Sequence, residues 1–280
     1  MHSTSAKTKP SGLSPLSFAR SLWRHRELLW QFTLRNVEMR TRGSHLGLIW
    51  SVINPLLMMG LYVFVFGYIF GGKFSAVANE TKIDFALALF LGLTVFQVFA
   101  EVFAISPTVI ISNPNFVKKV VFPLEILPAS NVAASLFHFL IALFLVLLGV
   151  AVIGPGLKLS ALWLPVILVP VILYALGIAW FFAAVGVFFR DIGQLVGFVS
   201  MVLMYASAIF YPLSMLPERA WAVLKYNPIL LAIDLARNAV MWNQPMNFWH
   251  LSYLTVSSLC FCIVGYWCFR KMAPAFADVL

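Results

Sequence analysis

Few residues inside the long apolar runs of this chain have side chains that could carry chemistry. Glu101 is the one formal charge within those runs, and His138 and His250 are further titratable groups. Such side chains in a membrane can relay protons or bind a substrate. Ion-coupled transport usually needs more of them. We therefore interpret Glu101 as a residue near the end of its apolar run whose side chain reaches the membrane–water interface. His138 has no carboxylate or cysteine beside it in its run, which favours an interhelical hydrogen bond.

A membrane-embedded transferase would need clustered acids, His or Arg at one membrane surface. The turn FRDIG, with Arg190 and Asp191, is the one compact candidate, and a water-facing ion pair is the simpler interpretation. Cys260, Cys262 and Cys268 share the last apolar run, where packing is the usual role of cysteine. We therefore expect no catalytic residues, no disulfide framework and no metal site.

The chain has no loop of its own for holding ATP. A G-x-x-x-x-G-K-[ST] motif, whose backbone cradles phosphates, does not occur anywhere in the sequence. We expect this chain to bind no cofactor. If ATP drives transport, a separate subunit must supply the hydrolysis.

The composition is that of an integral membrane protein. Of the 280 residues 62% are hydrophobic and 10% charged, and the mean hydropathy is +0.93. No water-soluble fold of this length hides so much apolar surface in a core. The excess of 19 Lys and Arg over 10 Asp and Glu then sets membrane orientation and does not indicate nucleic acid as a partner.

The apolar runs predict an all-α protein with six transmembrane helices, since a span needs about 20 apolar residues. The predicted spans cover residues 48–70, 85–105, 127–153, 159–189, 195–211 and 249–269. The fourth is long and contains Pro165 and Pro170, so it is kinked or begins outside the bilayer. The runs leave no room for a soluble domain, and residues 44–280 form one membrane domain.

The basic residues predict that both termini are cytoplasmic. Most of the 19 Lys and Arg residues precede the first span or fall in loops on the same side of the membrane. The opposite side holds only Lys73, Lys82, Lys158, Arg219, Lys225 and Arg237. Cytoplasmic loops are the ones enriched in Lys and Arg.

The N-terminal region predicts a short flexible cytoplasmic segment, 1–14, followed by an amphipathic helix over 15–43. Polar residues recur every three or four positions in that helix beside an apolar stripe. We expect it to lie in the cytoplasmic headgroup layer and to contact membrane lipids, with packing on its own protein as the alternative. The residues assigned to this interface are Trp23, Arg24, Trp30 and Arg35.

The connection between the last two spans is too apolar for a plain extracellular loop. Its sequence, LPERAWAVLKYNPILLAIDLARNAVMWNQPMNFW, is broken by Pro217, Pro228 and Pro245 into two helix-sized pieces. We expect two short re-entrant helices that dip part way into the outer leaflet, which is tolerated where protein buries the turn.

The connector NPNFVKKVVFPLEILP, residues 113–128, is short, basic and framed by Pro114, Pro123 and Pro128. Proline fixes φ, so this loop is stiff. Adjacent Lys118 and Lys119 can meet acidic groups or lipid phosphates, although positive-inside anchoring alone would also account for them.

These segments together resemble a known family. RTRGSHLGLIWSVINPLLMMGLYVFVFGYIF at the first span, the connector above and YNPILLAIDLARNAV before the last span are similar to the ABC-2 type polysaccharide-export permeases. The resemblance covers nearly the whole chain. It implies a homodimer of permeases joined to two ABC ATPase subunits, which bind ATP and Mg, in the bacterial inner membrane. It also implies a lipid-linked polysaccharide such as O antigen, capsule or teichoic acid as substrate.

The resemblance further implies that the connector is a coupling helix docked on the ATPase. The residues it assigns to coupling are Asn113, Pro114, Phe116, Lys118, Lys119, Phe122 and Pro123. It also suggests that the re-entrant helices gate the outer mouth. Two alternatives stay open: an ABC-2 exporter of a small lipophilic compound and, less favoured, a membrane-embedded transferase.

The aromatic stretch YVFVFGYIF in the first span offers flat surfaces on which a polymer could slide. Tyr62, Phe66 and Phe70 form one helical stripe, and Phe64 and Tyr68 a second. Contact with lipid or a neighbouring helix is the common role of such residues. Because Tyr joins an apolar ring to a polar tip, we predict that Tyr62 and Tyr68, with Phe66 as a third, line the translocation path.

Overall fold

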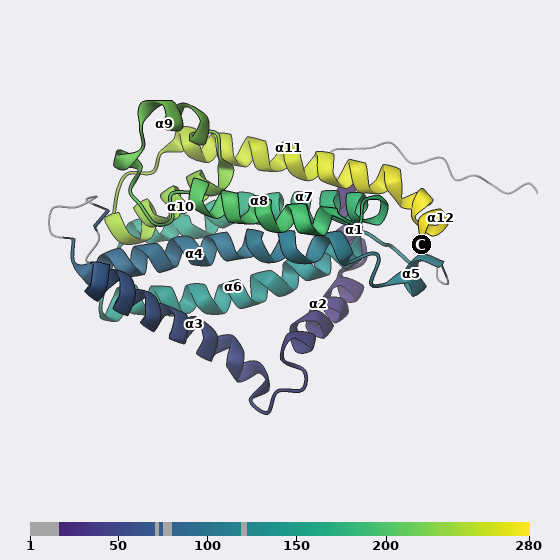
Figure 1. Ribbon diagram of the computed structural model, residues 1–280, viewed down its shortest axis with the longest axis horizontal. Helices are drawn as coiled ribbons and strands as arrows, with labels where there is room; N and C mark the ends of the chain where they lie inside the picture. The colour runs from purple at the N-terminus through teal and green to yellow at the C-terminus, as the bar shows by residue number, and fades with distance from the viewer. Residues whose placement is uncertain (1–16, 71–72, 75–79, 119–121) are drawn as a thin grey trace, which may run out of the picture.

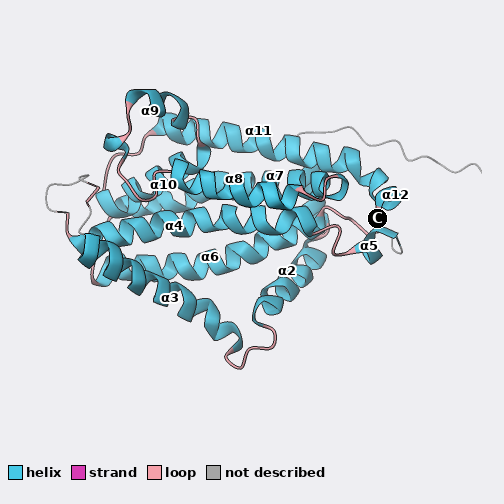
Figure 2. Cartoon of the chain, in the orientation of Figure 1, coloured by secondary structure: helices cyan, strands magenta, loops and turns pink. Residues whose placement is uncertain are grey.

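The computed structural model describes residues 17–70, 73–74, 80–118 and 122–280. The predicted segment 1–14 and Lys119 lie outside these ranges. Within them every regular element is a helix, and the long helices run roughly side by side (Figures 1 and 2). The prediction of an all-α protein is confirmed.

The twelve α-helices of the described chain alternate with short 3₁₀ or π-helical segments. The first half contains α1 (Ser17–Arg24), α2 (Arg26–Thr41), α3 (Trp50–Tyr62), α4 (Lys82–Ile105), α5 (Pro114–Lys118) and α6 (Ile126–Val152). The second half contains α7 (Leu164–Phe188), α8 (Ile192–Ala206), α9 (Glu218–Leu224), α10 (Pro228–Arg237), α11 (Phe248–Met272) and α12 (Phe276–Val279). The π-helical segments are Val63–Phe70 and Asn238–Trp242, and the 3₁₀ segments are Gly47–Ile49, Ser106–Thr108, Leu159–Trp163, Leu213–Met215 and Ala273–Ala275.

Five helical stretches of the described chain are long and apolar enough to cross a membrane. They are Gly47–Ile69, Lys82–Thr108, Ile126–Val152, Leu159–Phe188 and Phe248–Val279. They coincide with five of the six predicted spans. The sixth, predicted over 195–211, corresponds to α8, whose 15 residues span about 22 Å. That length is less than the roughly 30 Å of a bilayer core.

The spans differ in how much of each is buried by the rest of the protein. In the most apolar window of each, 67% of the α4 residues are buried but only 6% of the α3 residues. Figure 1 shows α4 inside the bundle, and it shows α3 leaning away from the bundle toward α2. The apolar side chains of α3 therefore face outward or toward the space between α3 and the bundle.

The tightest helix crossing joins α7 and α11. A Cβ added to Gly265 would overlap the carbonyl oxygen of Gly177, so both positions require glycine for the backbones to approach. Tyr174 and Phe261 stack beside this crossing with ring centroids 4.9 Å apart. Small residues at helix contacts are the usual device of membrane bundles, where van der Waals packing holds helices together.

The N-terminal region predicted as one helix over 15–43 contains two consecutive helices, α1 and α2. His25, with φ −109° and ψ 27°, separates α1 from α2. Burial differs along the predicted apolar stripe: Val37 is buried against the protein, whereas Trp23 and Trp30 are 73% and 62% exposed. Trp30 and Val37 are seven residues apart, so they lie on the same side of α2, and only Val37 is covered by the protein.

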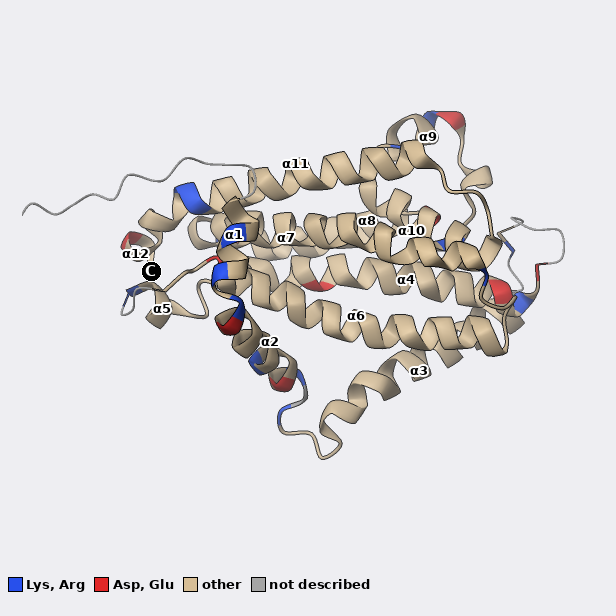
Figure 3. Cartoon of the chain, turned by 180° about the vertical axis from the view of Figure 1, so that it is seen from behind, with Lys and Arg blue, Asp and Glu red and all other residues tan. Residues whose placement is uncertain are grey.

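The connection before the last span is helical where its sequence indicated. Pro217 precedes α9 and Pro228 begins α10, as expected from the fixed φ of proline at helix starts. Figure 3 shows that most charged residues of the described chain lie near the two ends of the bundle, with many on α1 and α2. The long helices between them are almost uncharged.

Candidate functional site

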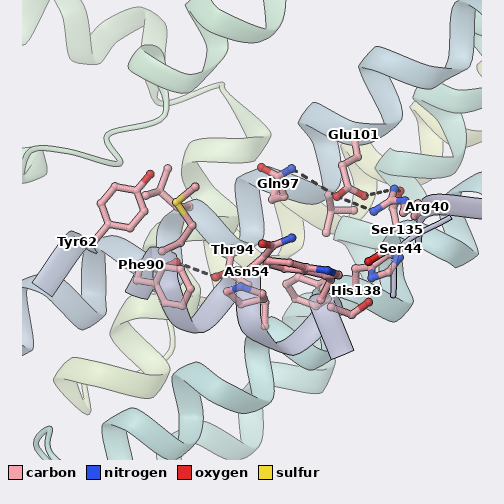
Figure 4. Close-up of a pocket in the computed structure, with 18 residues that line it drawn as sticks. Arg40, Ser44, Asn54, Tyr62, Phe90, Thr94, Gln97, Glu101, Ser135 and His138 are labelled. Carbon is pink, nitrogen blue, oxygen red and sulfur yellow. Dashed lines mark hydrogen bonds and ion pairs between the residues drawn. The ribbon is translucent and has the colours of Figure 1, made fainter. Parts of the chain in front are cut away.

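A cavity of about 680 Å³ lies between the bundle and the N-terminal arm, which we define as α1 and α2. We call it the groove, and Figure 4 shows its lining. The lining residues are Arg40 and Ser44 from α2 and the loop after it, Trp50, Ser51, Asn54, Pro55, Met58 and Tyr62 from α3, Phe90, Leu93, Thr94, Gln97, Val98 and Glu101 from α4, and Ser135, His138, Phe139 and Ala142 from α6.

The helical period explains why polar side chains of α4 meet in the groove. Phe90, Thr94, Gln97 and Glu101 follow one another at intervals of four, three and four residues, which puts them on one face. Gln97 is exposed although the residues on both sides of it are buried. The spacing of Thr94, Gln97 and Glu101 within an apolar run is visible in the sequence and indicates a shared polar face. An interpretation of Glu101 by itself does not reveal that face.

The polar end of the groove is held by an ion pair between α2 and α4. Arg40 Nη1 and Nη2 donate to Glu101 Oε1 and Oε2 over 3.0 and 2.7 Å. The side chains are 29% and 17% exposed. Ser135 and Gln97 add longer contacts of 3.4 Å. Glu101 therefore binds the N-terminal arm through Arg40. The sequence did not indicate this partner.

Two buried polar atoms of the described groove have no hydrogen-bond partner in the structure. They are Nε2 of His138 and Oγ of Ser51, from α6 and α3. The hydroxyl of Thr94, by contrast, bonds its own helix at the carbonyl of Phe90 over 2.8 Å. Unpaired buried polar atoms are rare in native proteins and mark places where water or a ligand can bind. The interhelical bond expected for His138 is thus not formed by this nitrogen.

The three aromatic residues predicted to line a path lie in different surroundings. Tyr62 lines the groove, and its ring centroid is 6.2 Å from that of Phe90 (Figure 4). Phe66 is partly buried and lies 6.1 Å from Phe210. Tyr68 is 71% exposed. The structure brings Tyr62 into a cavity and leaves Tyr68 on the outer surface of the protomer.

The predicted coupling connector forms the five-residue helix α5, which Pro114 begins. Asn113 Nδ2 donates to the carbonyl of Val109 over 2.8 Å and secures the entry. The rings of Phe116 and Phe122 lie 4.7 Å apart, and each is within 5.4 Å of the ring of Phe32 in α2. This aromatic cluster attaches the connector to the N-terminal arm.

Basic residues surround that cluster. The Arg35 guanidinium lies 4.7 Å from the centre of the Phe32 ring, which is a cation–π contact. Lys118 is exposed at the end of α5, and Pro123 follows as the chain turns back. Arg24 is exposed on α1, as expected for a residue at a membrane surface or in water.

Glu125, in the part of the connector that leads into α6, joins four segments. It is 4% exposed, and its Oε1 accepts from Ser21 Oγ over 2.8 Å and from Arg270 over 3.3 Å. Its backbone carbonyl accepts from Trp180 Nε1 over 3.0 Å. Movement of the connector would therefore displace contacts to α1, α7 and α11 together. No local pattern in the sequence distinguishes this residue.

A second charged centre lies in α10. Arg237 is 5% exposed, and it donates to the carbonyl oxygens of Ala88, Ala208 and Ile209 over 2.8, 2.8 and 2.6 Å. Ala208 has a φ of 50°, in the left-handed region that disfavours alanine. Arg237 thus satisfies the carbonyl groups where the chain breaks after α8, and this explains why that helix is shorter than predicted.

The charge of Arg237 is balanced nearby. Burial lowers the pKa of Arg237 to about 9, and Asp234 opposes the shift, so the guanidinium is protonated at neutral pH. Burial likewise raises the pKa of Asp234, against the effects of Arg237, His250 and a hydrogen bond from Asn238. The Phe74 ring lies 4.3 Å from the guanidinium. In the sequence, Arg237 is one of six basic residues assigned to the side opposite the termini, and no structural role was predicted for it.

Comparison with known proteins defines the class. The family model described as ABC-2 type transporter matches residues 27–241, and the chain belongs to this family. The resemblance seen in the sequence is confirmed, and with five apolar helices the chain is a multi-pass membrane protein.

Individual relatives narrow the comparison. The chain is 30% identical to an O-antigen export system permease protein RfbA from Klebsiella pneumoniae over 256 residues, which is 91% of this chain and 95% of the relative. A protein of the same name from Myxococcus xanthus is 27% identical over 73% and 76% of the two chains. The polysialic acid transport protein KpsM from Escherichia coli is 25% identical over 86% and 92%.

Proposed function

We propose that this chain is the permease subunit of an ATP-driven ABC exporter that moves a lipid-linked polysaccharide, specifically O antigen, from the cytoplasmic side across the inner membrane. The observation that carries the proposal is the similarity to O-antigen export permeases over nearly the full length of both proteins. The polar and aromatic lining of the groove agrees with a glycan as cargo.

The proposed topology has six spans and two cytoplasmic termini. The sixth span is α8 together with the residues that follow it, and α9 with α10 re-enters the outer leaflet. The excess of Lys and Arg on the side of α1, α2 and α5 supports this orientation. Burial of α10 between other helices supports re-entry, because non-helical backbone at membrane depth must be covered by protein.

The proposed assembly contains two copies of this chain and two ABC ATPase subunits. The low burial of α3 supports a second copy, since its exposed apolar residues need a partner or lipid. Helix α5 would dock on the ATPase, which binds ATP and Mg. The contacts of Phe116 and Phe122 with Phe32, and of Glu125 with α1, α7 and α11, offer a route from the connector to the spans.

Deletion of this chain in its own bacterium tests the function. We expect surface polysaccharide to disappear while the lipid-linked glycan accumulates inside, as measured by surface labelling and by extraction of the lipid fraction. A catalytically dead ATPase partner should give the same result. Unchanged surface glycan, with loss of efflux of a small lipophilic compound, would support the alternative exporter.

A further inference from the structure

The groove has the chemistry of a sugar site and lacks that of an anion site. Arg40 and Glu101 are the two formal charges of its described lining, and they bind each other through both carboxylate oxygens. The guanidinium is therefore already neutralised. A phosphate or carboxylate placed there would meet Glu101 at short range and would find no unpaired cation in the described lining to offset the repulsion.

The remaining polar atoms can both donate and accept hydrogen bonds. Asn54 and Gln97 present exposed amides, and Ser51 and His138 present buried atoms without partners. Amides, hydroxyls and neutral imidazoles are complementary to sugar hydroxyls, which also donate and accept. Buried atoms without partners gain more from a ligand than atoms that are already paired.

The aromatic side chains complete the arrangement. Trp50 and Tyr62 line the groove from α3, so it has flat rings as well as the polar side chains of α4. Aromatic rings contact the apolar face of a pyranose. A volume of about 680 Å³ is within the range of small-ligand sites.

We propose that this groove binds uncharged sugar units of the transported glycan, and that the Arg40–Glu101 pair excludes acidic sugars and the phosphate group of the lipid carrier. The inference rests on the proposed function. It adds a substrate class, a neutral glycan, to the site. Ser51 and His138 supply the hydrogen bonds, and Arg40 acts as the counter-ion of Glu101.

Saturation-transfer NMR on the full chain in lipid nanodiscs tests the proposal. The probes are maltotriose and chitotriose, which are neutral, and α2,8-linked trisialic acid, which is acidic. We expect saturation transfer to at least one neutral trisaccharide and none to trisialic acid. Removing two hydrogen bonds with Ser51→Ala and His138→Phe should weaken neutral binding about tenfold. A matched pair on α11, Ser257→Ala with His250→Phe, should leave it unchanged.

A gain of binding gives the sharper test. Glu101→Gln frees the Arg40 guanidinium, so trisialic acid should bind at least about tenfold more tightly than to wild type. The neutral double variant Arg40→Gln with Glu101→Gln should not gain acid binding. The proposal would be overturned if the wild type bound neither neutral trisaccharide. It would also be overturned if the wild type bound trisialic acid as tightly as a neutral trisaccharide. Neutral binding as tight in Ser51→Ala with His138→Phe as in the wild type would overturn it too.

These outcomes are separable from failure of the proposed function. If the deletion strain loses surface glycan while groove variants bind sugars like the wild type, the permease assignment stands and the sugar site is elsewhere. If neutral sugars bind the groove but deletion leaves surface glycan unchanged, the site stands and the export assignment fails.

Discussion

Arg237 lies within the helical bundle and Arg40 lies at its edge on α2, and the two occupy opposite kinds of environment. Arg237 is 5% exposed and donates to three backbone carbonyls, so it holds α4, α10 and the break after α8 in one position. Arg40 is 29% exposed and pairs with one carboxylate at the edge of a cavity that contains unpaired polar atoms. A buried charge with three backbone acceptors fixes structure, whereas a partly exposed ion pair beside unpaired polar atoms borders a space that a ligand can enter.

The comparison predicts that loss of Arg237 damages the fold most. Arg237→Ala leaves three carbonyls and Asp234 without their partner, and removing one member of a buried charged network costs about 3–5 kcal/mol. We expect a large fall in thermal stability and little folded protein. Arg219→Ala, on exposed α9, is the control and should behave as wild type. Normal stability of Arg237→Ala would show that the carbonyls find other donors.

Gly92 offers an indirect test of the same centre. A Cβ at this position would lie 2.5 Å from Arg237 Nη2 and 3.1 Å from Ile233 Cγ2. Gly92→Ala should therefore displace the guanidinium and destabilise the protein by about 2 kcal/mol, as overpacking does. Gly197→Ala is a matched control in open space on α8, and it should be neutral or stabilising. Unfolding of both variants in detergent measures the difference.

The sequence predicted the elements better than the contacts between them. Apolar runs and prolines placed five spans and the starts of α9 and α10, because span length and proline geometry are local properties. The Arg40–Glu101 pair joins positions 61 residues apart, and no local pattern specifies such a partner. The acceptors of Arg237 are backbone carbonyls, which every residue has, so their identity leaves no trace in sequence.

The connector gives a third environment, in which Lys118 is exposed at the end of α5. Replacing Lys118 and Lys119 by Glu should leave the protein inserted but reduce co-purification with the ATPase about tenfold, because misplaced charge at a docking contact is unfavourable. Lys158→Glu with Lys225→Glu, predicted to lie on the opposite side of the membrane, is the control. Unchanged assembly and export would mean that these lysines act only in membrane orientation.

The smallest expected effect separates two tyrosines of the same helix. Tyr62 lines the groove beside Phe90, whereas Tyr68 is 71% exposed. If a polymer slides over aromatic faces, Tyr62→Ala should lower glycan export and its stimulation of ATPase activity a few-fold while the complex still assembles. Tyr62→Phe keeps the ring and should retain most export. If the groove of a single copy is the whole path, Tyr68→Ala should lower export less than Tyr62→Ala. If a second copy completes a path across α3, the two variants should lower export equally. Wild-type export in the double alanine variant would show that the aromatic stripe serves packing alone.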